Sequence, residues 1–349
     1  MRACRRLTWL SAAAFLAALP STAAAFTLGD SVKLGLQGVY ASPKWAPDGQ
    51  GIALAGDKYG GLYIADVYGN LRQISDAPLA GWKFAWSPDG RNIAYRTRDE
   101  EGMGMRLNVA GRDGESREIT PTLNDLLPPT WDKDGITYRS GDELVTVDKD
   151  GKVLRSRSLS GGNGTLSKAA AVTGAMLMGR ITGATFTALS LLVSQPRKSD
   201  AALSAGSLYT DPDNLLWVVD ENGNRRKLLD VEGEPGYFNP VGDGRGDYAV
   251  SGLSGNLYIA SSDTTNVIEL GNGSNPAWSP DGAYIVFERT TDDGHEITSS
   301  DLWIASDDGT VVQRLTDTPE IEGQPSWSPD GKWIAYIVDG VVHLAPIGQ

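Results

Sequence analysis

Short runs of apolar residues alternate with Asp-Gly and Asn-Gly turns along almost the whole chain, at a period of about 40 residues. One apolar run follows each turn, as in Ile93-Ala-Tyr95 and Ile285-Val-Phe287. A second run follows a variable loop, as in Leu62 to Ala65 and Leu302 to Ala305. Short β-branched and aromatic runs bounded by such turns predict strands and hairpins. Because no helical period follows the first 25 residues, the pattern predicts an all-β chain.

The first turn of each repeat carries a motif with Trp at its start and Asp-Gly at its end. Its five clear copies begin at Trp45, Trp86, Trp131, Trp278 and Trp327. A repeat of this length suits the four-stranded blade of a β-propeller. Glycine supplies the positive φ of the turn and aspartate can bond the backbone two residues on, so we expect structural aspartates here rather than catalytic ones. The tryptophans are expected to pack between neighbouring blades.

Copies of the third strand of the repeat give the number of blades. Their centres are Tyr63, Leu107, Val145, Trp217, Tyr258, Trp303 and His343. They predict a seven-bladed β-propeller, with six or eight blades left open because the middle of the chain has lost the motif. The long gap between Val145 and Trp217 predicts an insertion in blade 4, around residues 181–207. We therefore expect residues 26–349 to form a single propeller domain.

The last repeat supplies only three strands, which bears on how the ring closes. Residues Thr27-Leu28 and Val32 to Leu36 precede the first full repeat and can provide the missing outer strand. Such a closure by the N-terminal strand would remove the exposed sheet edges, which otherwise promote aggregation.

Residues 1–25 have the pattern of a secretory signal peptide. Arg2, Arg5 and Arg6 form a basic start, an apolar stretch runs from residue 7 to residue 19, and Ala23-Ala24-Ala25 offers a cleavage site. The pattern predicts an exported protein, in the periplasm or outside the cell.

Composition removes several classes of function. The net charge is −13, and a surface this acidic repels nucleic acid and anionic lipid. No later stretch approaches the ~20 apolar residues of a membrane-spanning helix, so we expect no membrane insertion. The one cysteine lies in the leader, which excludes disulfides, thiolate catalysis and thiolate metal sites in the exported chain. We expect a monomer without cofactors.

The Trp-Ser-Pro-Asp-Gly motif, followed by Ile-Ala-Tyr and then by Leu-Trp-Ile, resembles the TolB-like propeller repeats, which are WD-like repeats. The resemblance covers roughly residues 40–349. It implies a propeller fold, export and a protein-binding role. Two differences stand out. TolB has an α/β domain ahead of its propeller, whereas only about 15 residues separate the expected cleavage site from the first blade here. TolB-type propellers also usually have six blades.

Residues able to carry catalysis or bind metal are few. His295 and His343 are the only histidines, and His343 falls in a strand where other repeats place core aromatics. His295 lies in Asp292-Asp293-Gly294-His295-Glu296, where His295 and Asp293 are the weak candidates for a metal ligand, although a solvated polar loop explains the segment equally simply. The sequence offers no Gly-x-Ser-x-Gly elbow, and we predict no catalytic residues.

Loop lengths indicate the functional surface. In a four-stranded blade the first and third turns share one face, and these are tight in this chain. The connections on the opposite face are long and varied; we call this the long-loop face, and binding residues usually lie on such loops. Trp82, Tyr237 and Phe238 precede the innermost strands near the axis and are candidate aromatic anchors, or else fill the channel.

Acidic residues also accumulate on the long-loop face, and they bear on the charge of the partner. They are Asp76, Asp125, Glu232, Glu234, Asp317, Glu320 and Glu322. Among them, Glu320 and Glu322 are candidate binding residues. A negative rim favours a basic partner or cations, although it also serves solubility.

Three functions remain, of which the last is a structural module in an envelope assembly. The first is an exported propeller that binds a protein or peptide partner through the long-loop face, without chemistry of its own. The alternative is a propeller enzyme or carbohydrate-binding protein that uses carboxylates and aromatics at the channel mouth; two carboxylates about 5–9 Å apart would favour glycoside hydrolysis.

Overall fold

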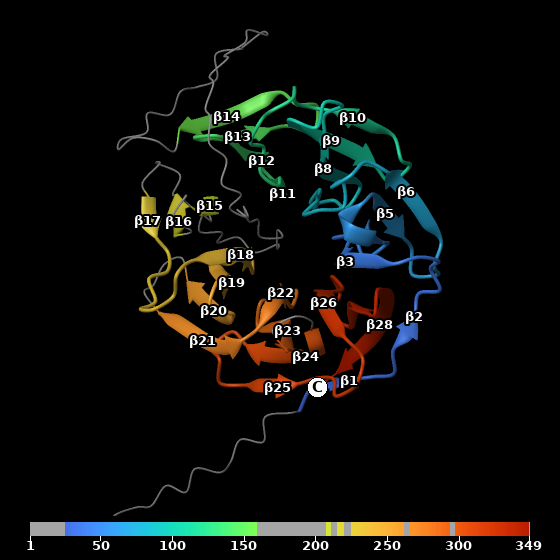
Figure 1. The fold of residues 1–349 in the computed structure, drawn as a ribbon, viewed down its shortest axis with the longest axis vertical. Helices are drawn as coiled ribbons and strands as arrows, with labels where there is room; N and C mark the ends of the chain where they lie inside the picture. The colour runs from blue at the N-terminus through green and yellow to red at the C-terminus, as the bar shows by residue number, and fades with distance from the viewer. Residues whose placement is uncertain are drawn as a thin grey trace, which may run out of the picture.

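The computed structural model describes residues 25–158, 207–210, 215–219, 225–261, 266–293 and 297–348. Antiparallel sheets stand around a central axis, with each sheet running from an inner to an outer strand (Figure 1). The described part is all-β apart from one short 3-10 helix, η1 (Asp57–Tyr59). The arrangement is a β-propeller, as the sequence predicted.

Three complete blades form the first half of the ring. The first consists of β3 (Tyr40–Trp45), β4 (Ile52–Gly56), β5 (Leu62–Ala65) and β6 (Leu71–Ser75). The second consists of β7 (Ala85–Trp86), β8 (Asn92–Arg98), β9 (Met105–Gly111) and β10 (Ser116–Glu118). The third consists of β11 (Thr130–Asp132), β12 (Gly135–Ser140), β13 (Glu143–Val147) and β14 (Val153–Ser158).

The second half of the ring begins with a three-stranded sheet of β15 (Ser207–Thr210), β16 (Leu216–Val219) and β17 (Arg225–Lys227). The β18 blade consists of β18 (Tyr237–Gly242), β19 (Asp247–Gly252), β20 (Asn256–Ser261) and β21 (Val267–Asn272). The β22 blade consists of β22 (Ser274–Trp278), β23 (Tyr284–Asp292), β24 (Ile297–Ser306) and β25 (Val312–Arg314). The closing blade consists of β26 (Glu322–Trp327), β27 (Trp333–Val338) and β28 (Val341–Gly348), with β1 (Thr27–Leu28) and β2 (Val32–Lys33) on its outer edge.

This topology corrects the expected number of blades. Within the described residues six sheets have four or more strands, so the complete blades number six rather than seven, which is the lower of the alternatives left open. The three-stranded sheet lies between the third blade and the β18 blade (Figure 1). The predicted insertion at 181–207 lies outside the described residues except for Ser207, the first residue of β15.

The N-terminal strands close the ring, which confirms the sequence prediction. Thr27 and Leu28 pair with Gly348 and Ile347, and β2 pairs with the start of β28. The backbone of Phe26 exchanges two hydrogen bonds with the side chain of Gln313, at 3.0 and 2.6 Å. Because β28 would otherwise be an open edge, these few residues join the two ends of the chain.

The hydrogen bonds of the repeated first turn are seen in the second blade. The hydroxyl of Ser87 donates to Asp89 at 2.6 Å, and Asp89 also accepts from the backbone N–H of Arg91. Gly90 has φ of 68° and donates to the carbonyl of Ser87 at 2.8 Å. The aspartate thus holds the turn together, and the same pattern recurs at Asp281 and Asp330. The structural reading of these aspartates is confirmed.

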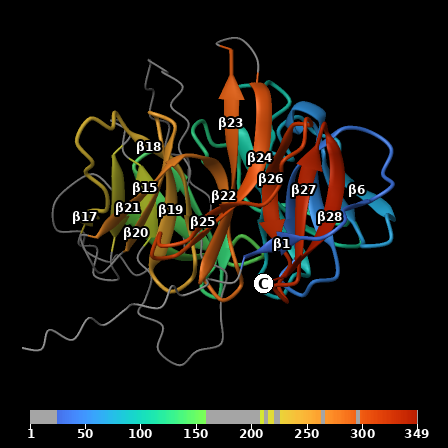
Figure 2. The ribbon, with the colours of Figure 1, turned by 90° about the horizontal axis from the view of Figure 1, so that it is seen from below.

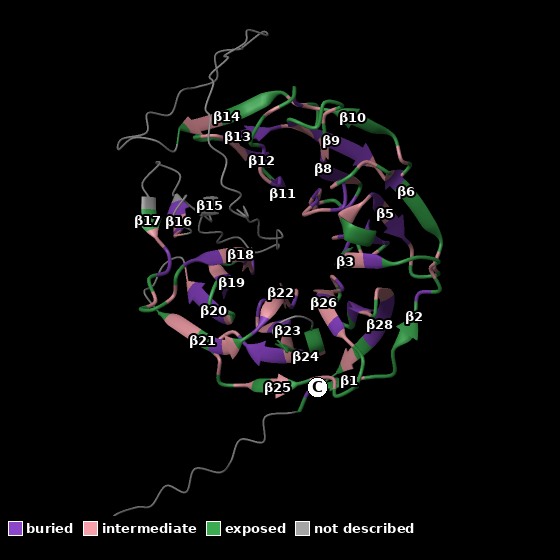
Figure 3. Cartoon of the chain, in the orientation of Figure 1, coloured by how far each residue is buried: buried purple, intermediate pink, exposed green. Residues whose placement is uncertain are grey.

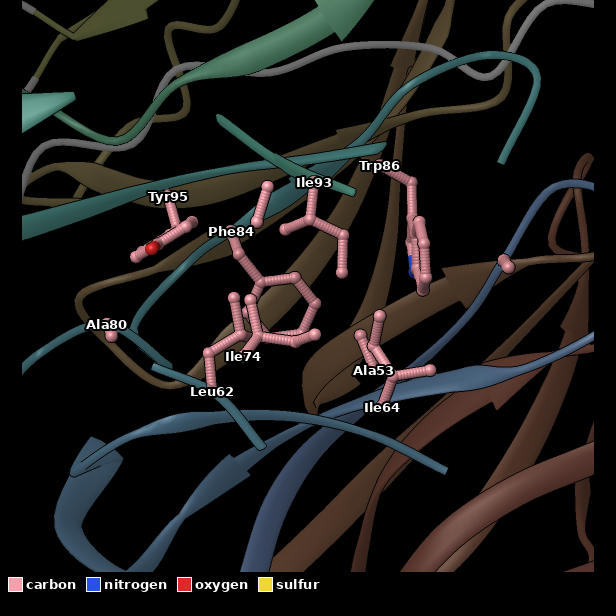
Figure 4. Close-up of a cluster of buried hydrophobic side chains, with 11 residues drawn as sticks. Ala53, Leu62, Ile64, Ile74, Ala80, Phe84, Trp86, Ile93 and Tyr95 are labelled. Carbon is pink, nitrogen blue, oxygen red and sulfur yellow. The ribbon is translucent and has the colours of Figure 1, made fainter. Parts of the chain in front are cut away.

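Apolar clusters between neighbouring blades form the core. The middle strands are buried, whereas the outer strands β6, β10 and β14 are largely exposed (Figure 3). Figure 4 shows the cluster between the first and second blades, where Phe84 is 1% exposed and packs with Ile93 and Leu62. Burial of one such side chain is worth about 1.5–3 kcal/mol. The indole N–H of Trp86 donates to the carbonyl of Lys44 in the first blade at 3.1 Å, so this tryptophan links two blades as expected.

Candidate functional site at the ring axis

The long connections of the propeller share one face. Leu126, in the connection from β10 to β11, forms a bridge with Ser140 at the end of β12. Ile321, just before β26, forms a bridge with Ser300 of β24. The hairpin of β23 and β24 projects from the rest of the ring on this side (Figure 2). These contacts support each other, so the long-loop face is built from loops that a rigid scaffold positions.

Five residues near the start of the innermost strands have a positive φ angle and a partly exposed side chain. Three positions ahead of the motif tryptophan or its equivalent, the φ angle is between 46° and 53°. These residues are Ser42, Lys83, Asn239, Asn275 and Gln324. At four of them the strand register shifts by a β-bulge. All five are partly exposed, while the residue after each is a buried proline or Phe84.

Strands β3, β18, β22 and β26, which carry four of these residues, lie on the inner side of the ring (Figure 1), and Lys83 directly precedes β7. Lys83, at the entrance to the second blade, donates a hydrogen bond to Asn239 of the β18 blade. The backbone N–H of Ser42 donates to Gln324 of the closing blade at 2.5 Å. Residues far apart in sequence therefore meet in polar contacts where the innermost strands begin.

Trp82 is a predicted aromatic that the structure places near these contacts. It is partly exposed, and its ring lies 4.8 Å from the guanidinium of Arg96 and 5.6 Å from the ammonium of Lys83. A cation over an indole ring is attracted by the negative face of the ring. Trp82 therefore offers apolar surface beside two positive charges.

The other predicted aromatics differ in exposure. Tyr237 is only 2% exposed; its hydroxyl accepts from the backbone N–H of Val231 at 2.9 Å, and its ring packs edge-on against Tyr258. The structure thus places Tyr237 in the core of the β18 blade, with its hydroxyl already engaged in a hydrogen bond. Phe238, at the position equivalent to Trp82, is partly exposed.

The two acidic residues predicted to bind a partner also differ in exposure. Glu320 is exposed, whereas Glu322 is 4% exposed. Burial raises the pKa of Glu322, and the charges of Asp301 and Glu320 add to this, although the hydroxyls of Thr316 and Thr318 oppose it. Asp301 is itself paired with Arg314 at 2.7 Å. Glu322 is thus a buried group of the closing blade, not a rim residue.

Of the two weak candidates for a metal ligand, the structure describes Asp293 but not His295. His295 lies outside the described residues, and Asp293 is an exposed residue at the tip of the β23–β24 hairpin. His343 is buried beside Tyr336, with Nδ1 3.0 Å from the hydroxyl of Ser31. Its core position is as expected. Within the described ranges no group of three potential ligands is placed to hold a metal ion.

A cluster of positive charges at the axis was missed by the sequence analysis. It comprises Lys44 of β3, Lys83 and Arg96 of β8, and we call it the cationic cluster. Arg96 is 3% exposed, its Nη1 donates to the carbonyl of Leu126, and its Nε and Nη2 have no hydrogen-bond partner. Among the ion pairs of the described part of the chain, none involves these three residues.

Burial within the ring lowers the pKa of all three groups. Desolvation lowers the pKa of Lys44 to about 8 and that of Arg96 to about 9. For Lys83 desolvation is again the largest cause, and repulsion from Lys44 and Arg96 contributes to a pKa of about 8. Lys44 nevertheless keeps exposed surface. Lys44 therefore combines solvent-exposed surface with a lowered pKa. Both are expected of an ammonium group that faces the inside of the ring, where protein surrounds it on most sides.

A carboxylate stands at the equivalent place in the β22 blade, and it already accepts several hydrogen bonds. Glu288 of β23 occupies the position of Arg96 in its own blade. Its carboxylate accepts from the hydroxyl of Ser274 at 2.9 Å, from Asn275 at 2.7 Å and from the backbone N–H of Gln324 at 2.6 Å. The carboxylate of Glu288 therefore already has hydrogen-bond partners, in contrast to Nε and Nη2 of Arg96. A comparison of the repeats could have revealed the cationic cluster, since Lys44 and Lys83 replace small or neutral residues of other copies.

No helix in the described part of the chain is long and apolar enough to cross a membrane. No protein-family model matches the chain, and no curated protein matches it. Among solved structures, one match is the crystal structure of TolB from Acinetobacter baumannii, with a TM-score of 0.46 and 15% sequence identity. The match covers 83% of this chain and 57% of that one, so the chain spans little more than half the length of the TolB structure. The propeller assignment accordingly rests on the strand topology of the chain itself.

Proposed function

We propose that this propeller is an exported module that binds a protein or peptide partner at the axial end of its long-loop face. The observation that supports the proposal most directly is the exposed edge of Trp82 beside the cationic cluster, on the face where the long connections gather. Aromatic side chains flanked by polar groups are typical anchors of protein interfaces. The leader pattern at residues 1–25 supports export.

The enzymatic alternative receives less support from the described residues. Glu288 is committed to three hydrogen bonds, and Glu322 is almost completely buried. A general acid or base must reach the proton that it transfers. The described carboxylates therefore favour the binding function over the enzymatic one.

Site-specific photocrosslinking tests the binding face. A photoreactive amino acid is placed at Met103, which is 75% exposed in a loop of the long-loop face, or at Tyr68, which is 88% exposed in a turn of the opposite face. We expect a discrete crosslinked partner from position 103 and none from position 68. Trp82→Ala should reduce the yield at least tenfold. Equal crosslinking from both positions, or crosslinking from position 68 alone, would contradict the proposal.

Export is tested separately. Cell fractionation and N-terminal sequencing should find a mature chain that begins at Phe26 outside the cytoplasm. A cytoplasmic chain that retains its first residues would contradict this part of the proposal.

A further inference from the structure

The cationic cluster is unusual in a chain with a net charge of −13. Each residue comes from a different place: Lys44 from the first blade, Lys83 from the connection that leads into the second, and Arg96 from the second strand of the second blade. Like charges brought together in a poorly solvated place destabilise one another, so such a cluster needs a compensating group. We propose that Lys44, Lys83 and Arg96 form an oxyanion site that binds a carboxylate group of the peptide partner. This inference rests on the proposed binding function and specifies the chemistry of the bound group.

Arg96 contributes the most specific part of the geometry. A guanidinium is planar, and its Nε–H and Nη2–H lie on the same edge, with a spacing that matches the two oxygens of a carboxylate. Nη1 donates to the carbonyl of Leu126, whereas the buried Nε and Nη2 have no hydrogen-bond partner among the described residues. A buried donor without a partner costs about 1–3 kcal/mol. The edge of Arg96 that is suited to a bidentate carboxylate is thus the edge that the protein leaves unpaired.

The two lysines add donors and charge to the cationic cluster, in which Lys83 is repelled by both Lys44 and Arg96. The ammonium of Lys44 donates to the carbonyl of Phe84 at 3.2 Å, and that of Lys83 donates to Asn239. Since an ammonium group has three donors, each lysine retains donors for a ligand. Neither lysine forms an ion pair with a described residue, and desolvation lowers the pKa of each to about 8. An anion placed between them would relieve the repulsion.

Trp82 limits what can carry the carboxylate. Its ring contacts Arg96 and Lys83, so the three groups are held as one unit, with the partly exposed indole as an apolar wall. A peptide can place a carboxylate on the cations and its apolar atoms on the indole. The acidic surface elsewhere on the chain disfavours polyanions such as nucleic acid. At the axis the inserted group is therefore acidic, in contrast to the basic partner that the acidic rim led us to expect.

Titration calorimetry with small peptides tests the site without the natural partner. The probes are three acetylated pentapeptides: one with a central glutamate and an amidated C-terminus, one of alanine with a free C-terminus, and one of alanine with an amidated C-terminus. Inorganic phosphate is the fourth probe. We expect binding of at least one carboxylate peptide, at least tenfold tighter than that of the uncharged peptide or of phosphate. The glutamate and alanine arms distinguish a side-chain carboxylate from a terminal one.

Substitutions locate the binding. Lys44→Met and Arg96→Lys should each weaken carboxylate binding at least tenfold, the latter because lysine keeps the charge but loses the bidentate edge. Lys133→Met, an exposed lysine in a tight turn on the opposite face, removes the same charge and should change affinity less than twofold. Circular dichroism checks folding, and exposed Lys44 provides the test if the Arg96 variant does not fold.

Three outcomes would overturn the inference: no binding of either carboxylate peptide, tighter binding of phosphate, or equal losses in the Lys44 and Lys133 variants. If crosslinking from position 103 persists while both carboxylate peptides fail to bind, the carboxylate site is wrong and the proposed binding face stands. If the peptides bind as expected but crosslinking marks the opposite face, the oxyanion site stands and the proposed partner surface is wrong.

Discussion

Replacing Lys83 by methionine should stabilise the protein, because the charge of this side chain works against folding. Its pKa falls from 10.5 to about 8, first through desolvation and then through repulsion from Lys44 and Arg96. At about 1.4 kcal/mol per pKa unit, this shift sets an upper limit of about 3.5 kcal/mol on the penalty of the protonated form. Partial exposure reduces the penalty, and the lost hydrogen bond to Asn239 offsets about 1 kcal/mol. We expect a net gain of about 1–2 kcal/mol near pH 7.

The pH dependence gives this prediction its sign. The unfolded chain keeps the proton on Lys83 up to about pH 10.5, whereas the folded protein releases it near pH 8. The penalty is therefore complete below pH 8, and it disappears as the pH rises from 8 to 10.5. The advantage of Lys83→Met over the wild type should be largest at pH 6.5–7.5 and should vanish above pH 10.5.

Urea denaturation at pH 6.5, 7.5 and 10.5 measures this difference, with Lys133→Met as the charge-matched control. The control should change the free energy of unfolding by less than about 0.5 kcal/mol at each pH. A Lys83→Met variant that is less stable than the wild type at pH 7, or a gain that does not depend on pH, would refute the reasoning. A confirmed gain would mean that the chain retains a destabilising charge, which is common at binding sites.

Three further predictions address ring closure, blade contacts and the oxyanion site. Phe26→Ala should lower the free energy of unfolding by about 3 kcal/mol in urea, since Phe26 is 7% exposed and packs edge-on against Tyr284 at 4.6 Å; a loss below 1 kcal/mol would show that closure does not depend on this ring. Gly81→Ala should lower the free energy of unfolding by more than about 2 kcal/mol, because the new Cβ would lie 2.7 Å from the Cα of Ala55. Gly102→Ala, whose Cβ would have nothing within 4 Å but whose φ is 70°, should lower it by about 1 kcal/mol. Equal losses in thermal unfolding would contradict the close contact at Gly81. Carboxylate affinity by calorimetry should fall at least fivefold from pH 7 to pH 9.5 as Lys44 and Lys83 lose their protons next to Arg96; a flat profile would exclude both lysines from the site.

The fold was largely predictable because its signals are local. Each turn depends on neighbours within five residues, such as Ser87, Asp89 and Gly90, and these produce the same hairpin wherever they recur. Ring closure by Thr27 and Leu28 followed from the missing outer strand of the last repeat. The number of complete blades was wrong because the middle of the chain lacks the motif on which counting depends.

The candidate site was only partly predictable. Trp82 was identified from its position ahead of an innermost strand, but the same rule selected Tyr237, which lies in the core. The two positions differ by one residue in the strand register, and that single step changes which side of the strand a residue occupies. The cationic cluster was missed because Lys44, Lys83 and Arg96 resemble ordinary surface charges in the sequence.

The amino-acid sequence by itself determined the all-β repeat, its turns and the tight and long faces, because hydrophobic spacing and turn residues act over a few positions. Only the tertiary structure decided which side chains meet at the axis, where Lys83 contacts Asn239 from the far side of the chain. It also decided their electrostatic character, since a lysine or arginine becomes poorly solvated only when the closed ring surrounds it. Composition pointed to an acidic surface, whereas the ring brings together three positive charges that form no ion pair with any described residue.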